Sequence, residues 1–149
     1  MLMPKKTKYR KMFKGRIKGR VATKNNVICF GDYALCSLDK GKITSRQIEA
    51  GRIAINRSVK KGGRLIIRIF PHLPVTKKPA ETRMGKGKGT VEYYIARVKP
   101  GTIIFELGEV TEEQAKEAFR VAEHKLPVKC RLIRRENKET VKVGSNETC

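Results

Sequence analysis

Two stretches of the chain repeat apolar residues with the period of an α-helix. The first covers residues 44–61, where apolar side chains and one glycine recur at spacings of three and four residues. These positions are Ile48, Gly51, Ile55 and Val59. Thr44 and Gln47 precede the stripe at the spacing of a capping box, and Gly62 and Gly63 follow it. The pattern predicts a helix with one buried face.

The second helical stretch covers residues 111–125. Thr111 and Gln114 repeat the capping-box spacing, and Glu112 and Glu113 fall in the first turn, where the helix dipole favours negative charge. The apolar stripe consists of Ala115, Ala118, Phe119, Ala122 and Leu126. Its small residues predict close packing on a sheet, and Pro127 predicts where the helix stops.

Between and around the helices, short runs rich in β-branched and aromatic residues predict strands. The runs are 27–30, 34–36, 64–70, 91–98, 102–107 and 128–133. Turns are expected at 39–42 and at Pro100-Gly101, the second joining two strands in a hairpin. Helices interspersed with strands predict an α+β fold, a two-layer sandwich of a mixed or antiparallel sheet with two helices.

Residues 71–90 show neither a helical nor a strand period, so a long loop is predicted there. Its end reads RMGKGKG, in which glycines alternate with cations and no acid intervenes. Glycine permits positive φ and a close approach of backbone to a ligand. The loop therefore suits phosphate, although a flexible surface loop is an alternative that the sequence leaves open.

Charge is distributed unevenly along the 149 residues. The chain carries 35 Lys and Arg against 14 Asp and Glu, a net charge of +21. Residues 1–90 hold 24 of these cations and 4 of the acids, whereas residues 91–149 hold 11 and 10. Because nearly all the excess lies in the first ninety residues, one region is expected to face a polyanion, and nucleic acid is the commonest polyanion.

The first 26 residues form a basic N-terminal arm without a single acid. Tyr9 and Phe13 interleave with its cations, which favours an arm that orders on nucleic acid over a merely solvated tail. The expected organisation is thus an arm at 1–26, an α+β RNA-binding core at 27–134 that includes the 71–90 loop, and a polar tail at 135–149.

Several other classes of protein are disfavoured by the motifs. The glycines of GKGKG match neither a Walker A loop nor a dinucleotide fingerprint, because Thr90 and a strand follow them rather than a helix. Four separated cysteines and two histidines show no zinc spacing, and reduced thiols are expected. No catalytic set, cofactor site, secretory signal or membrane span is predicted, so the chain is not expected to be an enzyme or membrane protein.

Four segments together resemble one family, in the same order and over roughly residues 4–133. They are PKKTKYRKMFKGRIKG, ITSRQIEAGRIAINR, IRIFPHLPVTKKPAETRMGKGKGTVEYYIARVKPGTIIFEL and AKEAFRVAEHKLPVKCRLI. They are similar to the bacterial and organellar large-ribosomal-subunit protein sixteen (uL-sixteen) family. Gly51 departs from the alanine that is more frequent there.

The resemblance implies a structural constituent of the large ribosomal subunit with an α+β core. It implies binding of 23S-type rRNA and a role in positioning tRNA at the aminoacyl site, or the peptidyl site, near the peptidyl-transferase region. Neighbouring large-subunit proteins are further expected partners, and no homo-oligomer is expected. The ribosome of the cytoplasm, or of an organelle's stroma or matrix, is the expected location.

Residue roles follow from the same resemblance. The implied tRNA-proximal loop consists of Arg83, Met84, Gly85, Lys86, Gly87 and Lys88. The implied rRNA contacts are Lys5, Lys6, Lys8, Arg10, Lys11, Lys14 and Arg16 of the arm, and Arg46, Arg52, Arg57 and Lys60 of the first helix. A free RNA-binding regulator or chaperone that does not reside on ribosomes is the alternative.

Overall fold

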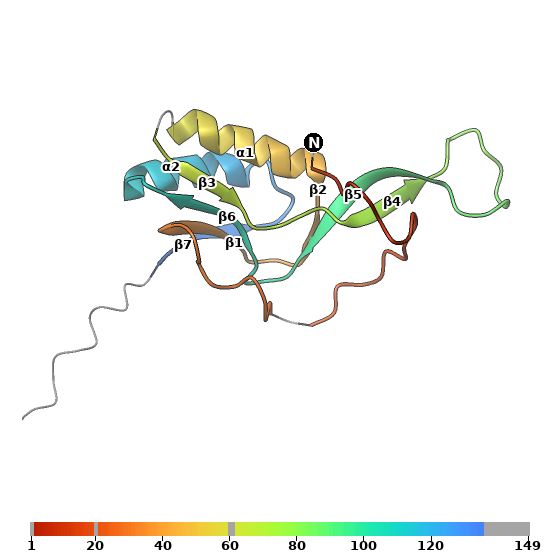
Figure 1. Ribbon diagram of the computed structural model, residues 1–149, viewed down its shortest axis with the longest axis horizontal. Coiled ribbons are helices and arrows are strands. Elements are labelled where there is room, and N and C mark those ends of the chain that lie inside the picture. Colours follow the sequence, from red (N-terminus) through yellow and green to blue (C-terminus); the bar gives the residue numbers. More distant parts are fainter. Residues whose placement is uncertain (1, 20, 60–61, 136–149) are drawn as a thin grey trace, which may run out of the picture.

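The computed structural model describes residues 2–19, 21–59 and 62–135, which form two antiparallel sheets and two helices (Figure 1). One sheet has the strand order β3-β6-β1-β7 and the other has the order β2-β5-β4. In chain order the elements are β1 (Tyr33–Ser37), β2 (Gly41–Thr44), α1 (Ser45–Val59), β3 (Arg64–Ile67), β4 (Leu73–Lys77), β5 (Thr90–Val98), β6 (Ile103–Gly108), α2 (Glu112–Glu123) and β7 (Cys130–Arg134). The predicted α+β class is confirmed, with the strands divided between two sheets. The hairpin predicted at Pro100-Gly101 is wrong, because β5 and β6 lie in different sheets and do not pair.

Both helices begin as their sequences predict. The Gln47 backbone N–H donates to the Thr44 hydroxyl at 3.2 Å, and the Thr44 N–H donates to the Gln47 side chain at 2.9 Å. Thr111 and Gln114 make the same reciprocal pair at 3.4 and 3.2 Å. Each box satisfies two backbone donors that a helix start otherwise leaves unpaired.

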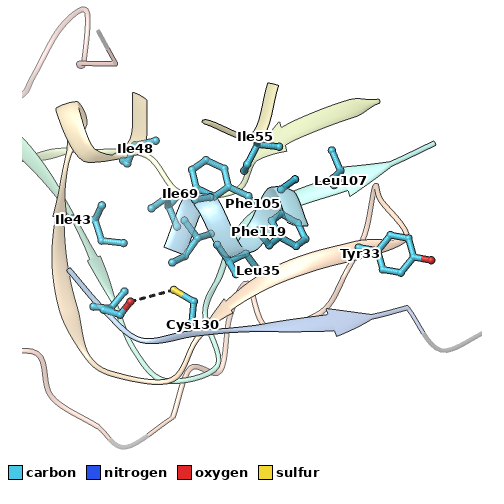
Figure 2. Packing of buried hydrophobic residues seen from close by; sticks show 14 of the residues in the cluster. Tyr33, Leu35, Ile43, Ile48, Ile55, Ile69, Phe105, Leu107, Phe119 and Cys130 are labelled. Carbon is cyan, nitrogen blue, oxygen red and sulfur yellow. Dashed lines mark hydrogen bonds between the residues drawn. The ribbon is translucent and has the colours of Figure 1, made fainter. Parts of the chain in front are cut away.

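The main core lies where the two helices pack against each other and the four-stranded sheet (Figures 1 and 2). The predicted stripes are buried in both helices except for Leu126, which lies beyond α2 and is only partly buried. Phe105 and Phe119 are the largest fully buried side chains. A Cβ built on Gly51 would come within 3.0 Å of the Phe105 ring. Glycine at this position therefore lets α1 approach β6 closely.

The core also holds two of the cysteines as reduced thiols. Cys36 and Cys130 are buried, and the Cys130 thiol lies 3.4 Å from the Val128 carbonyl oxygen, to which it donates (Figure 2). Burial, reinforced by the nearby Glu123 carboxylate, raises the pKa of Cys130 to about 12. Cys29, Cys36 and Cys130 are free in the described part of the chain.

The predicted loop at 71–90 is wrong at its beginning. Residues Leu73–Lys77 form β4, which pairs with β5, so the irregular segment is shorter than expected. Pro74 concealed this strand, but β4 is an edge strand, where a residue without an N–H donor is tolerated. The turn predicted at 39–42 is likewise displaced, because Gly41–Thr44 forms β2 against the other end of β5.

The strand predicted at 27–30 is also wrong, and Glu106 explains why. Its side chain is fully buried and accepts backbone N–H donors from Cys29 at 3.2 Å, Phe30 at 2.7 Å and Gly31 at 3.0 Å. The carboxylate also pairs with Arg68. The segment thus donates its N–H groups to one side chain of β6 rather than to a strand ladder.

Candidate nucleic-acid interface

The glycine-basic loop extends from a hairpin, β4 and β5, that reaches away from the helices (Figure 1). At the base of the loop, a Cβ on Gly89 would lie 2.5 Å from the Lys77 carbonyl oxygen, so only glycine lets the two sides of the hairpin come so close. Further out, the Lys78 ammonium donates to the Gly85 carbonyl at 2.5 Å. Every residue from 81 to 88 is exposed.

The tip of the loop has an unusual backbone. Gly85, Lys86 and Gly87 all have positive φ, at 105°, 53° and 83°. Glycine adopts this conformation freely, whereas Lys86 does so at a cost of about 1 kcal/mol. A Cβ on either glycine would meet nothing within 4 Å, so open space surrounds the tip and backbone conformation is what requires glycine there.

The basic arm lies on the face of the three-stranded sheet that points away from the main core. Ile43 pairs with Ala96, and both side chains belong to that core, so Ile95 and Arg97 point to the opposite face. The Arg97 guanidinium donates to the carbonyl oxygens of Phe13, at 3.4 Å, and Lys14. On the same face, Ile95 forms a second buried cluster with Leu73 and Val75.

Arm and loop are joined directly. The Lys11 ammonium donates to the Lys88 carbonyl at 2.7 Å, and the Lys88 ammonium donates to the Met12 carbonyl at 2.7 Å. The Lys88 ammonium also lies 5.3 Å from the centroid of the Phe13 ring. The arm and the loop therefore form one continuous basic surface, although the bonded residues are separated by 76 and 77 positions in sequence.

The C-terminal part of the arm is fixed to the core by Asn25. The Asn25 side-chain amide donates to the backbone carbonyls of Arg68 at 3.2 Å and Ile103 at 2.9 Å. The Asn25 backbone carbonyl accepts from the Ile103 N–H at 2.9 Å. Asn25 has a φ of 57°, a conformation that asparagine tolerates better than most residues. Nearby, the Ala22 N–H donates to the Pro100 carbonyl at 2.8 Å.

The cations of this surface have few acidic neighbours. Residues 1–31 contain no Asp or Glu, and the loop from 78 to 90 contains only Glu81. The predicted arm residues are all exposed, namely Lys5, Lys6, Lys8, Arg10, Lys11, Lys14 and Arg16. Among the described residues, Arg83 and Lys86 make no side-chain hydrogen bond or ion pair, so their charges face solvent.

The predicted helix cations divide into two kinds. Arg46 and Arg57 are exposed and eleven positions apart, which brings them back to one face of α1, opposite its buried stripe. Arg52 lies beside the stripe and forms an ion pair with Glu49 at 2.5 Å. This bond lowers the pKa of the Glu49 carboxyl, and phosphate would have to compete for the arginine. Lys60 lies outside the described residues.

The described ranges offer little for other chemistry. Within them, no group of three or more His, Cys, Asp and Glu could hold a metal ion, and no helix is long and apolar enough to cross a membrane. His72 is exposed, with Nδ1 3.2 Å from the Phe70 carbonyl oxygen, and His124 caps the end of α2. His72 directly precedes β4 and His124 lies at the end of α2, so the two histidines belong to different parts of the fold.

Sequence reasoning missed three residues that fix the arm and the segment after it: Arg97 and Asn25 hold the arm, and Glu106 holds residues 29–31. Arg97 does carry a signal, since it follows Ile95 at strand spacing in an otherwise apolar run. Asn25 and Glu106 carry none, because each acts through partners 38 to 78 positions away.

Comparisons with known proteins agree on one family. Residues 4–133 match the family described as ribosomal protein L16p/L10e. The large ribosomal subunit protein uL16 of Sulfurihydrogenibium sp. (strain YO3AOP1) is 61% identical over 134 residues, which cover 90% of this chain and 96% of that relative. The matched range includes the arm from residue 4 onward, the loop, and all nine elements except the last residue of β7.

Proposed function

The chain belongs to the ribosomal protein L16p/L10e family and is a constituent of the large ribosomal subunit, and on this premise we propose that its arm, loop and first helix bind RNA. The arm and α1 bind phosphates of 23S-type rRNA, and the loop reaches tRNA at the aminoacyl site near the peptidyl-transferase region. The role is structural, and we assign the protein no reaction. It acts in the ribosome of the cytoplasm or of an organelle, beside other large-subunit proteins.

One observation supports this proposal above all: arm and loop form a single basic surface. The Lys11–Lys88 and Lys88–Met12 bonds join the arm to the loop. Together the two segments contain ten predicted contact cations and a single acid, Glu81. Such a charge density repels itself unless a polyanion neutralises it. Binding a folded RNA releases counterions from its phosphates and supplies that neutralisation.

The geometry of the loop suits a narrow site between RNA elements. At the exposed tip, glycines alternate with long cationic side chains, so the backbone itself is thin. The open space around Gly85 and Gly87 leaves room for a phosphate chain to approach. Arg83 adds a planar guanidinium that can pair with phosphate through two bonds. We therefore assign the tRNA contact to Arg83, Lys86 and the backbone between them.

The first helix provides a second contact of a different kind. Arg46 and Arg57 lie on one face of α1, separated by about 16 Å along the axis. Two cations at this separation can contact phosphates on opposite sides of a groove. Arg52, already paired with Glu49, contributes less to this contact.

The decisive experiment rebuilds large subunits that lack this protein with wild-type chain or with the double variant Arg83→Gln and Lys86→Gln. The variant should enter subunits normally but bind tRNA at the aminoacyl site more weakly. The slope of log affinity against log salt should fall by about 2, one for each phosphate contact removed.

A matched control removes the same charge elsewhere. Lys116 and Arg120 lie on α2, where they pair with Glu112 at 2.7 Å and Glu117 at 2.8 Å. Replacing both by glutamine should leave tRNA binding unchanged. Equal binding by all three proteins would refute the loop assignment, and failure of wild-type chain to sediment with the large subunit would refute the function itself.

A further inference from the structure

Phe13 is a large apolar side chain that lies almost entirely in solvent. It is 92% exposed, although it belongs to the part of the arm that is attached to the sheet. Its backbone is held on both sides: the carbonyls of Phe13 and Lys14 accept from Arg97, and the Met12 carbonyl accepts from Lys88. The fold thus fixes the position of the residue while leaving its ring unburied.

A cation covers the ring on one side. The Lys88 ammonium lies 5.3 Å from the ring centroid, within the range of a cation–π contact. Its bond to the Met12 carbonyl holds it there at 2.7 Å. An aromatic ring has two faces, so the ammonium limits the orientation of the ring and leaves the opposite face available to a planar partner.

We propose that Phe13 is a stacking platform for an unpaired nucleobase of RNA, an inference that rests on the proposed RNA-binding function. The base stacks on the open face of the ring, and the phosphates on either side of it are neutralised by Lys14 and Lys88. Stacking on a fixed aromatic side chain is tolerant of base identity, because every base has a π-face. The ligand is therefore a single-stranded or flipped-out nucleotide.

The surroundings favour a nucleotide over a protein partner. Phe13 is flanked in sequence by Lys11, Lys14 and Arg16, with no acid among residues 1–31. Inserting the ring into an apolar pocket of another protein would bring these cations to the edge of that pocket. A nucleotide instead presents an apolar face and an anion within one residue, which is the combination that Phe13 and its neighbours match.

The chain offers a direct reporter for this inference because it contains no tryptophan. A Phe13→Trp variant would carry one indole at the site, whose fluorescence base stacking quenches. The probes are an oligouridine of about 12 nucleotides and an abasic ribose-phosphate oligomer of equal length and charge. Oligouridine should quench the indole strongly, whereas the abasic oligomer should bind by charge alone and quench little.

Phe30→Trp is the matched control. Phe30 is 59% exposed and has the Arg68 guanidinium carbon 5.2 Å from its ring centroid, so it too is an exposed ring beside a cation. It lies on the segment bound by Glu106 rather than in the arm next to the loop. Its indole should not be quenched by either oligomer.

Affinity measurements complete the test in the full-length chain. Phe13→Ala should weaken oligouridine binding by about tenfold, leave binding of the abasic oligomer unchanged, and preserve the salt slope. If wild type and Phe13→Ala bind both oligomers alike, stacking is refuted while phosphate binding stands. If neither oligomer binds wild-type protein in a salt-dependent way, the proposed RNA-binding function fails as well. If the variant instead releases a neighbouring protein from rebuilt subunits with oligouridine affinity unchanged, Phe13 docks on protein and the inference is wrong.

Discussion

The helix-bearing core and the arm–loop surface keep their shapes by different interactions. In the core, both helices and both sheets share fully buried apolar side chains such as Phe105 and Phe119 (Figure 2). The arm and loop are held instead by Lys11, Lys88 and Arg97, whose cationic groups donate to backbone carbonyls. Phosphate cannot replace the apolar contacts of the core, but it can compete with the backbone carbonyls for each of these donors. The core is therefore a constant scaffold, and the basic surface can exchange these internal contacts for contacts with the proposed RNA ligand.

The two regions also differ in how their charges are compensated. On α2, Lys116 and Arg120 pair with Glu112 and Glu117 within one turn of the helix. In the arm, no acid is present to form such pairs. Compensated charge favours solubility and local helix stability, while uncompensated charge provides affinity for a polyanion. The four experiments below test this division, and they are ordered by the expected change in the free energy of unfolding.

Phe105→Ala should cause the largest loss, because the ring is fully buried and packs against α1 at Gly51. The free energy of unfolding should fall by about 3–5 kcal/mol, from lost transfer energy and the cavity left behind. Urea denaturation followed by circular dichroism measures it. A loss below about 1 kcal/mol would mean that the core is not the scaffold described above.

Glu106→Gln should follow, with a loss of about 3 kcal/mol. The substitution keeps the shape but leaves Arg68, whose side chain is only 15% exposed, without its counter-ion. It also weakens the acceptor for the N–H groups of Cys29, Phe30 and Gly31, whose amide hydrogen exchange should quicken. Glu117→Gln, which removes an exposed partner, should cost much less, because exposed ion pairs contribute little to stability. Similar losses for both variants would contradict the role of Glu106.

The helices could be predicted from sequence because everything that defines them is local. Thr44 and Gln47, or Thr111 and Gln114, meet within one turn, and the stripes of both helices depend only on spacing. The loop and arm were recognisable from glycine and charge. Their mutual contact was not, because the two lysine–carbonyl bonds close chain segments 76 and 77 positions long.

The errors have the opposite origin, since long-range partners override local propensity there. Residues 27–30 are rich in strand formers, but Glu106 of β6 takes their N–H groups. Leu73–Lys77 contains a proline and reads as irregular, yet Leu73 and Val75 are buried on the face where the arm lies. Pro74 between them is buried as well, so the strand lacks the alternation of buried and exposed positions that would predict it.

Arg97→Met should detach the arm with little effect on the core. The free energy of unfolding should fall by about 1 kcal/mol, since methionine keeps the stem but removes the donors to Phe13 and Lys14. Limited trypsin digestion, monitored by mass spectrometry, should then cleave sooner among the arm lysines. Arg97→Lys keeps the charge and is the control. Its arm should be cleaved more slowly than that of Arg97→Met but faster than that of wild type, because an ammonium does not bridge two carbonyls as a guanidinium does. Unchanged cleavage in Arg97→Met would place the arm's attachment elsewhere.

Lys88→Met should change stability least, by less than about 0.5 kcal/mol, yet it should separate arm from loop. The variant loses the bond to the Met12 carbonyl and the cation over the Phe13 ring, while its own carbonyl still accepts from Lys11. Lys86→Met is the matched control, because it removes equal charge from a side chain that faces solvent. Backbone NMR relaxation of residues 11–14 should show greater mobility in Lys88→Met than in Lys86→Met. Added salt should narrow this difference by weakening the Lys88 contacts that Lys86→Met retains. Equal mobility in both variants would mean that arm and loop are neighbours without being coupled, and that their joint binding of RNA is assembled only on the RNA.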